Sequence, residues 1–178
     1  MVNLSQREFD NKKSVKMIFP MFTKINGDEL TPINIYYKLK GDYKFLLESS
    51  SSSKEEARYS FMGSKPYMVL SSRGEHVTIT KENKIKEETG KILDFAQEQL
   101  LKQYDNNDLE LPFIGGAIGY IGYDVIRQYE KLPDNNPDEL NLPETCLLFY
   151  KEFICFDHFN NTLMLIHNVF PEEDENYR

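Results

Sequence analysis

The sequence predicts an α+β fold with a mostly antiparallel, sandwich-like β-sheet core and a few flanking helices. Short runs with strand-like patterns recur along the chain, and only a few helical patterns interrupt them at irregular intervals. The 12 Phe and 11 Tyr residues supply bulky side chains that favour strands, and the chain has no Trp. A length of 178 residues suffices for one domain or for two small ones.

The N-terminal part of the chain is expected to hold two helices among short strands. Ser5 followed by Glu8 is a capping-box pattern, which predicts a helix through about Lys12. Thr31 before Pro32 provides an N-cap and a first-turn proline for a second helix that ends at Gly41. We expect strands over residues 17–25, 43–49, 58–64, 66–72 and 76–80. Pro20 restricts the first of them to an edge or a bend.

The C-terminal part shows one long helical pattern and two long strand patterns. Apolar residues at helical spacing predict a helix over 90–104. The glycine-rich stretch 112–124 leads into a short helix, and 133–144 reads as a polar loop. Residues 144–157 and 162–170 are expected to be the two strands of an antiparallel hairpin. The tail after Pro171 reads as the start of a helix without its end, which indicates a larger parent chain.

Charge and hydropathy limit the classes of function. The 29 acidic residues outnumber the 21 basic ones and give a formal charge of −8, whereas nucleic-acid binding needs a concentrated basic surface. No apolar run is long enough for a transmembrane helix, and the N-terminal residues lack the apolar region of a secretory signal. We therefore expect a cytoplasmic protein with neither a nucleic-acid nor a membrane partner.

Few residues indicate metal or catalytic chemistry. Cys146 and Cys155 fall in one strand-like run, which would hold them about 30 Å apart, so free thiols are predicted. The three histidines show no metal-ligand spacing, and we expect neither a metal site nor a catalytic residue in this region. The glycine cluster lacks the dinucleotide and P-loop patterns, so we interpret it as allowing close backbone approach or bulges: Gly115, Gly116, Gly119 and Gly122.

The residues LLESS (46–50) have the chemistry to bind an amino acid. Leu46 and Leu47 read as a buried strand with Glu48 at its end, and Ser49 begins a run of five serines. A carboxylate at the mouth of an apolar pocket can pair with an ammonium group, while a hydroxyl and free backbone N–H groups can hold a carboxylate. From these residues alone, an exposed strand end without a ligand stays open as the alternative.

Three stretches resemble a known enzyme family. Residues 45–66, FLLESSSSSKEEARYSFMGSKP, resemble the FLLES and RYSF segment of anthranilate synthase component I. Residues 112–133, PFIGGAIGYIGYDVIRQYEKLP, resemble that family's glycine-rich stretch, and DELNLPE followed by FDH is similar to its closing strands. The order and spacing agree from about Phe19 to Arg178.

The resemblance implies that residues 1–178 are the N-terminal regulatory domain of such an enzyme, with the C-terminal chorismate-binding catalytic domain outside this sequence. In the family the whole enzyme is a lyase of tryptophan biosynthesis, which converts chorismate and ammonia to anthranilate and pyruvate with Mg²⁺. A glutaminase subunit supplies the ammonia. The catalytic and metal residues belong to the other domain, so this region alone is expected to be inactive and to hold no cofactor of its own.

The resemblance also implies an allosteric feedback site. In the family, L-tryptophan binds between the LLES element and the larger domain, so the site positions carried over by motif are Leu47, Glu48 and Ser49. Glu48 would pair with the amino group, and Cys146 is included because the strand that leads to FDH passes near this pocket in relatives. The serine run replaces a more varied loop, so retention of feedback inhibition is left open. Two alternatives also stay open: the corresponding domain of aminodeoxychorismate synthase component I, an enzyme of the folate pathway, and a free-standing ligand-binding module.

Overall fold

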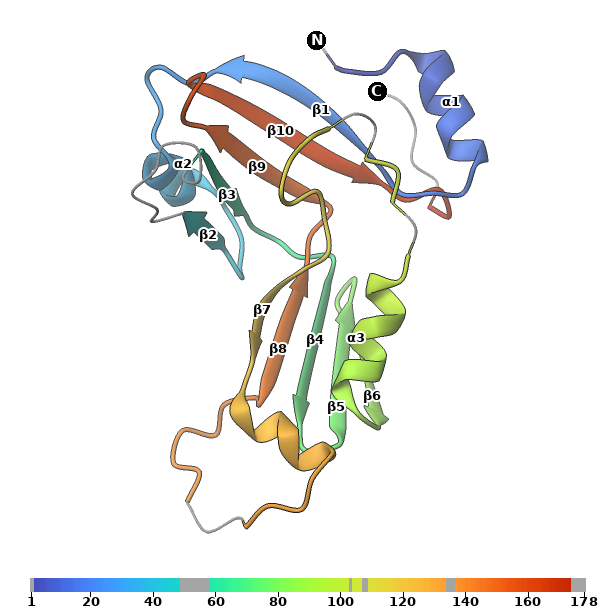
Figure 1. Cartoon of the computed structure of the whole chain (residues 1–178), viewed down its shortest axis with the longest axis vertical. Helices are drawn as coiled ribbons and strands as arrows, with labels where there is room; N and C mark the ends of the chain where they lie inside the picture. The colour runs from blue at the N-terminus through green and yellow to red at the C-terminus, as the bar shows by residue number, and fades with distance from the viewer. Residues whose placement is uncertain (1, 49–57, 103, 107–108, 134–136, 174–178) are drawn as a thin grey trace. The chain divides into compact units, whose positions relative to one another are not determined.

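Two compact units make up the structure, a computed structural model (Figure 1). It describes residues 2–48, 58–102, 104–106, 109–133 and 137–173. The first unit combines Met1–Lys65, Lys102–Gly115 and Tyr150–Arg178, and the second combines Pro66–Leu101 and Gly116–Phe149. Each unit is built on its own five-stranded antiparallel sheet and carries a few helices, which confirms the predicted α+β class.

The sheet of the first unit has the strand order β1-β10-β9-β3-β2. Its strands are β1 (Phe19–Asn26), β2 (Phe45–Glu48), β3 (Tyr59–Gly63), β9 (Glu152–Asp157) and β10 (Thr162–Val169). Strand β1 lies at an edge of the sheet, as Pro20 predicts. Proline has no backbone N–H, so it disfavours a position between two hydrogen-bonded strands. The N-terminal segment partly covers this edge, since the N–H of Asn3 donates to the carbonyl of Phe22 over 3.0 Å.

Both helices of the first unit cover the same face of its sheet. Phe9 of α1 (Gln6–Ser14) packs against Phe19 and Val169. Ile35 of α2 (Pro32–Lys38) lies in a second cluster with Met62, Phe156 and Leu163. The strand register and the alternation of side chains along each strand place all these strand residues on one face, which we name the helix face.

The helix starts agree with the capping patterns in the sequence. The Ser5 hydroxyl accepts from the N–H of Glu8, and the Glu8 carboxylate accepts from the N–H of Ser5 over 2.8 Å. Thr31 caps α2, and Pro32 is its first residue. Helix α2 ends at Lys38, three residues before the predicted Gly41, and Gly41 then takes a left-handed conformation with φ of 104°. The termination signal therefore acts after the last helical turn.

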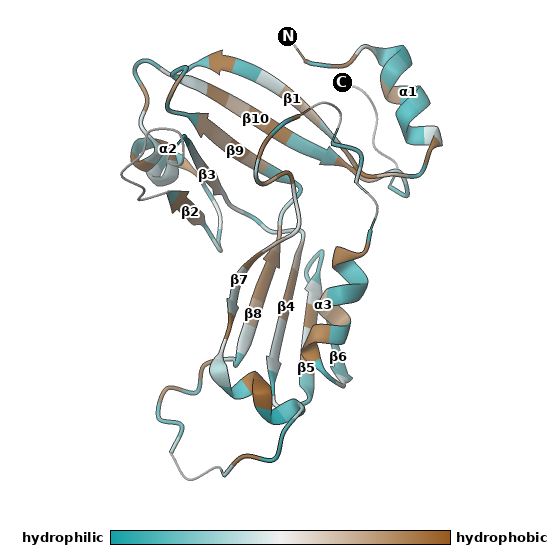
Figure 2. Ribbon diagram, viewed as in Figure 1, coloured by the Kyte–Doolittle hydropathy of each residue, from teal (hydrophilic) through white to brown (hydrophobic). Residues whose placement is uncertain are grey.

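The opposite face of this sheet is contacted by Phe113 and Ile114, and we name it the Phe113 face. The ring of Phe113 lies 5.6 Å from that of Phe61 and 5.1 Å from that of Phe153. The buried side chain of Asn168 donates to the carbonyl of Ile114 over 2.9 Å. Both faces of the central strands are thus covered, and β9 is accordingly among the most hydrophobic strands in Figure 2.

The second unit has the strand order β6-β5-β4-β8-β7. Its elements are β4 (Met68–Arg73), β5 (His76–Lys81), β6 (Lys84–Thr89), α3 (Ile92–Leu100), β7 (Ala117–Ile121), the 3₁₀ helix η1 (Tyr123–Gln128) and β8 (Thr145–Phe149). Ile92 and Ala96 of α3 and Val125 of η1 pack on one face of the sheet. The sheet contributes the rest of this core, which consists of Met68, Leu70, Val77, Leu147 and Phe149.

The predicted single strand over 144–157 is wrong. Strand β8 ends at Phe149 in the sheet of the second unit, and β9 begins at Glu152 in the sheet of the first. The apolar run is interrupted only at Lys151 and Glu152, and the partners that select a sheet for each half lie far away in the chain. Cys146 and Cys155 consequently lie on strands of different sheets, and both thiols are free, as predicted.

Three smaller differences from the sequence patterns concern the second unit. Strand β6 was not anticipated because its residues are polar and exposed; it is joined to β5 by Glu82 and Asn83, whose positive φ values of 50° and 62° suit a tight hairpin. The helix expected over 90–104 is shorter, and the helix expected after Asp124 is a 3₁₀ helix.

Within the described residues, no helix is both long and apolar enough to cross a membrane.

Candidate functional site

Strand β2 carries two of the predicted site residues at the edge of the first sheet. Leu46 packs into the cluster around Ile35 on the helix face. Because successive side chains point to opposite faces, Leu47 lies on the Phe113 face, where 45% of it is exposed. Glu48 ends the strand and is also exposed. Ser49 lies outside the described residues.

The three sequence motifs of the first unit meet on adjacent strands. Leu47 faces Phe61 across the β2–β3 pair, and Glu48 faces Ser60. Tyr59 in turn faces Asp157 across the β3–β9 pair. The LLES, RYSF and FDH stretches, which lie up to about a hundred residues apart in the chain, thus form one corner of the sheet. We call Leu47, Glu48, Ser60, Asp157 and His158 the motif corner.

Hydrogen bonds within the motif corner fix its polar side chains. The buried hydroxyl of Ser60 lies 2.7 Å from Nε2 of His158. The backbone N–H of His158 donates to the carbonyl of Arg58 over 2.9 Å, which extends the β3–β9 pairing by one residue. Glu48 is paired with Ser60 across β2 and β3, so its side chain points to the same face of the sheet. The carboxylate of Glu48, the hydroxyl of Ser60 and the imidazole of His158 therefore lie on one face of the corner.

An ion pair lies beneath this corner on the Phe113 face. Arg58 donates two hydrogen bonds to Asp157, over 2.7 Å and 3.1 Å, and its guanidinium is 4.8 Å from the ring centroid of Tyr59. Asp157 also accepts from the side chain of Asn160 and from the N–H of Phe159. Burial opposes ionisation of Asp157, but these hydrogen bonds outweigh it and lower its pKa to about 2.

The aspartate is therefore a fixed anion that anchors the β9–β10 hairpin to β3. The RYSF and FDH stretches resemble the family, yet neither pattern predicts Arg58, Ser60 or Asp157 as a site residue. Arg58 and Asp157 carry opposite charges at the ends of two motifs, which is a sequence signal for an ion pair. The pair forms only because of the register of β3 and β9, which the sequence does not reveal.

Cys146 belongs to the second unit, whereas Leu47 and Glu48 belong to the first. It lies on β8, where its neighbours across the strands are Ser71 and Tyr120. The side chain is partly buried, and that burial raises the pKa of its thiol. All residues of the motif corner belong to the first unit, so the membership of Cys146 in the site stays a prediction.

The glycine-rich stretch provides close backbone contact, as its interpretation from sequence proposed. A Cβ atom on Gly119 would overlap the carbonyl oxygen of Cys146 on the neighbouring strand. One on Gly122 would lie 2.7 Å from the carbonyl oxygen of Glu144. These glycines therefore allow β7 and the start of η1 to lie against the β8 segment, and they mark a structural role.

At least three pockets open on the described part of the first unit. One of about 590 Å³ lies on the Phe113 face beside Arg58, Tyr59 and Asp157. The other two, of about 410 and 630 Å³, lie on the helix face. Leu47 and Glu48 line none of these three pockets, so the part of the predicted site that the structure describes is an exposed surface. Among the described residues, no group of three His, Cys, Asp or Glu side chains is placed to hold a metal ion.

Comparison with known proteins identifies the family of this chain. A family model described as chorismate binding enzyme matches residues 43–178. The chain belongs to this family. The match includes the RYSF, glycine-rich and FDH stretches and all the residues of the motif corner.

Relatives within the chorismate binding enzymes are similar over most of this chain. Anthranilate synthase component 1 of Acetivibrio thermocellus is 34% identical over 155 residues, covering 85% of this chain and 31% of the relative. That of Bacillus pumilus is 35% identical over 170 residues, covering 92% and 32%. The crystal structure of anthranilate synthase component I from Streptococcus pneumoniae TIGR4 is 31% identical with a TM-score of 0.58, covering 85% of this chain and 32% of that one. The chain thus spans about a third of the length of these relatives.

Proposed function

We propose that this chain is the N-terminal regulatory region of an anthranilate synthase component I and contributes one side of an L-tryptophan feedback site. The complete enzyme would be a lyase that converts chorismate and ammonia to anthranilate and pyruvate, the first committed step of tryptophan biosynthesis. The similarity to anthranilate synthases supports the assignment of the enzyme. The meeting of the LLES, RYSF and FDH motifs at one corner is the observation that carries the regulatory role.

The chemistry of the exposed end of β2 suits a zwitterionic ligand. Leu47 offers exposed apolar surface on the Phe113 face and Glu48 lies on the helix face, so a ligand that contacts both would lie across the exposed end of the strand. Glu48 offers a carboxylate for the ligand's ammonium group, and the hydroxyl of Ser49 would donate a hydrogen bond to the ligand's carboxylate. Because this surface is open, the ligand's remaining contacts would come from the larger chorismate-binding region, with Cys146 as a further contributor. Tryptophan would then stabilise one arrangement of the two regions.

Inhibition requires that tryptophan bind the inactive arrangement better than the active one. A coupling free energy of about 1–3 kcal/mol is the usual scale for such effects. The catalytic residues and the Mg²⁺ site would lie in the larger region, and no residue of this chain is assigned to either. The glutaminase subunit would be the ammonia-supplying partner, and the region alone would have no synthase activity.

The direct test is feedback inhibition of the full-length enzyme. Ser49→Phe should fill the pocket and abolish inhibition while leaving uninhibited turnover largely intact. Glu48→Gln should raise the tryptophan concentration needed for half-inhibition by about tenfold, since a hydrogen bond to a charged group contributes about 1.5–3 kcal/mol. Glu29→Gln, an exposed glutamate outside the motif corner, is the matched control. If inhibition survives Ser49→Phe, the site assignment is wrong.

Binding to the 178-residue chain tests the sharing of the site. Isothermal calorimetry should give a millimolar or undetectable affinity for L-tryptophan, because half of the contacts are missing. Submicromolar binding would contradict a site completed by the larger region. Product analysis of the full-length protein with chorismate and ammonia should yield anthranilate, whereas aminodeoxychorismate would move the assignment to the folate enzyme.

A further inference from the structure

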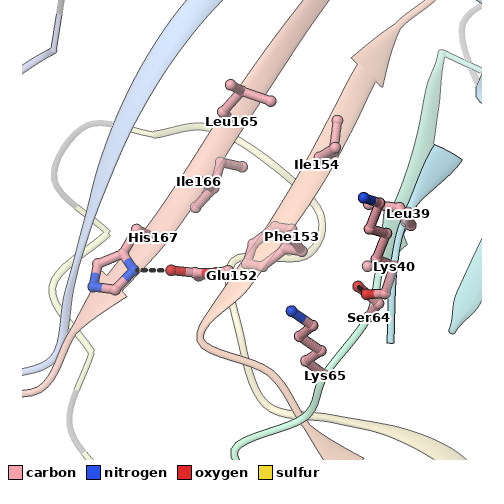
Figure 3. A pocket seen from close by; sticks show the side chains of 11 residues that line it. Leu39, Lys40, Ser64, Lys65, Glu152, Phe153, Ile154, Leu165, Ile166 and His167 are labelled. Carbon is pink, nitrogen blue, oxygen red and sulfur yellow. Dashed lines mark hydrogen bonds and ion pairs between the residues drawn. The ribbon is translucent and has the colours of Figure 1, made fainter. Parts of the chain in front are cut away.

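A pocket of about 410 Å³ opens on the helix face, and no residue of the motif corner lines it (Figure 3). Ile154 and Leu165 are neighbours across the β9–β10 pair and form its apolar floor with Leu39 from the end of α2. Leu165 is 38% exposed, although it lies in the interior of β10, which is a central strand. The pocket is within the size range of small-molecule sites, and an open apolar floor is typical of them.

Charged groups surround this floor. Glu152 and His167 face each other across the same pair of strands, with Nδ1 of His167 3.1 Å from the Glu152 carboxylate. That hydrogen bond lowers the pKa of Glu152 more than burial raises it, and the charge of Lys65 lowers it further. The only carboxylate that lines the pocket is therefore ionised at neutral pH and already has a partner.

Two ammonium groups, those of Lys40 and Lys65, also line the pocket, and the charge of Lys65 acts on Glu152 without forming a close ion pair. Within the described residues, neither lysine makes an ion pair shorter than 4 Å. Two ammonium groups against one carboxylate make the lining positive in a chain whose formal charge is −8. Such a local reversal of charge favours an anion, because the excess positive charge around an apolar floor attracts it.

The backbone holds the two lysines in place. The hydroxyl of Ser64 donates to the carbonyl of Lys40 over 3.0 Å, and the N–H of Lys65 donates to the carbonyl of Asp42 over 3.1 Å. Lys65 has a left-handed φ of 57°, and its side-chain stem lies so close to Gly41 that a Cβ there would be 2.5 Å from its Cγ. Unfavourable backbone conformations of this kind often accompany binding sites, and here one presents an ammonium group to the pocket.

We propose that this pocket binds a small monocarboxylate with an apolar body. The carboxylate would pair with Lys40 and Lys65, and the apolar body would lie on Ile154 and Leu165. Neither the motif corner nor the tryptophan site takes part, so this proposal stands apart from the proposed function. An adjacent hollow shares Glu152, Leu165 and His167 with the pocket, which leaves space for a longer apolar body.

The test is an NMR titration of the 178-residue chain with three probes of matched shape: 3-phenylpropanoate, 3-phenylpropanamide and phenethylamine. We expect saturable shifts of the backbone amides of Ser64, Lys65 and Ile154 with the carboxylate. Its affinity should exceed those of the amide and the amine by about tenfold. Higher salt should weaken it, because the charges are partly exposed.

Variants separate the charges from the floor. Lys65→Gln should weaken binding of the carboxylate probe about fivefold, and Leu165→Asn should weaken binding of both the carboxylate and the amide. Lys38→Gln, an exposed lysine on α2 that does not line the pocket, should have no effect. Lys65 has a left-handed backbone conformation, so its substitution also changes the local backbone preference. The comparison of the three probes on the unaltered chain tests the proposal without any substitution.

The proposal fails if the amide binds as tightly as the carboxylate, or if the shifts map to residues elsewhere. It also fails if no saturable binding occurs up to the solubility limit of 3-phenylpropanoate. Inorganic phosphate is the remaining control, because it is an anion without an apolar part. Displacement of the probe by phosphate at equal concentration would contradict the role assigned to Ile154 and Leu165.

Discussion

Asp157 shows how much one side chain contributes to the first unit. It accepts hydrogen bonds from Arg58, Asn160 and the backbone N–H of Phe159, and so joins β3 to the β9–β10 hairpin. Its pKa of about 2 lies below the value of about 3.9 expected in an unfolded chain. Ionised Asp157 therefore stabilises the folded state above about pH 4, and this contribution is lost as the pH falls from about 4 to about 2.

Asp157→Asn should lower the free energy of unfolding at neutral pH by about 1–2 kcal/mol. The pKa shift alone would allow a larger loss of stability, but Arg58 is partly exposed and solvent screens its charge. Urea denaturation at a series of pH values should show the difference from the unaltered chain shrinking below pH 4. Glu29→Gln is the exposed control. A difference that stays constant down to pH 2 would contradict the assigned role.

Sequence predicted residue chemistry better than residue partners. The capping roles of Ser5 and Thr31 depend only on neighbours within three residues, and both are confirmed. The pairing of Ser60 with His158 joins residues 98 positions apart, and no local pattern reveals it. The same limit applies to Lys40 and Lys65, which became neighbours of Glu152 only through the fold.

At the scale of the elements, β7 depends on the absence of side chains. Gly119 faces Leu147 across the β7–β8 pair, at a point where the backbone of Cys146 occupies the space of a Cβ atom. The glycine-rich stretch was correctly interpreted as allowing close approach. Its strand was less evident, because glycine has low strand propensity and only the neighbouring strand holds it in place.

Gly119→Ala should separate β7 from β8 and lower the free energy of unfolding by about 2–3 kcal/mol, since a steric overlap with backbone cannot relax through a side chain. Gly74→Ala is the matched control, because a Cβ there meets nothing within 4 Å. Its φ of 53° should cost only about 1 kcal/mol. Chemical denaturation of both variants measures the difference. Equal losses would show that the close contact with β8 is not the cause.

The break at Tyr150 and Lys151 explains why the strand pattern over 144–157 misled the sequence analysis. Both halves are apolar, strand-like runs separated only by Lys151 and Glu152, so their local signals are those of one strand. β8 is paired with β4 and β7, whereas β9 is paired with β3 and β10, and these choices are made by distant residues. Sequence thus predicted the fold class, most strands and the antiparallel pairing of β9 with β10, while the other strand partners required the structure.

At the scale of the whole molecule, each unit has its own hydrophobic core. The second unit packs α3 and η1 on its sheet around Ile92 and Val125, and the first packs α1 and α2 around Phe9 and Ile35. Neither unit is continuous in sequence, since the chain passes between them at residues 65–66, 101–102, 115–116 and 149–150. Separate cores predict that local damage affects one unit more than the other.

Ile92→Ala should test this separation. Ile92 is fully buried, so the change should lower the free energy of unfolding by about 2–5 kcal/mol through lost burial and a cavity. Hydrogen exchange should show a large loss of protection in β4, β5 and β8, and a smaller loss in β9 and β10. Leu93→Ala, whose side chain is 36% exposed on the same helix, is the control. Equal loss of protection in both sheets would show that the two cores open together.

The free thiols give each unit a reporter of its own. Burial, with the nearby charge of Asp157, raises the pKa of Cys155 to about 12, so almost no thiolate forms at neutral pH while β9 stays in its sheet. Burial also raises the pKa of Cys146 in the second unit. A pulse of maleimide followed by peptide mass analysis would therefore follow the opening of the first sheet at the buried Cys155 and the accessibility of the partly buried Cys146 in the second, without an engineered cysteine.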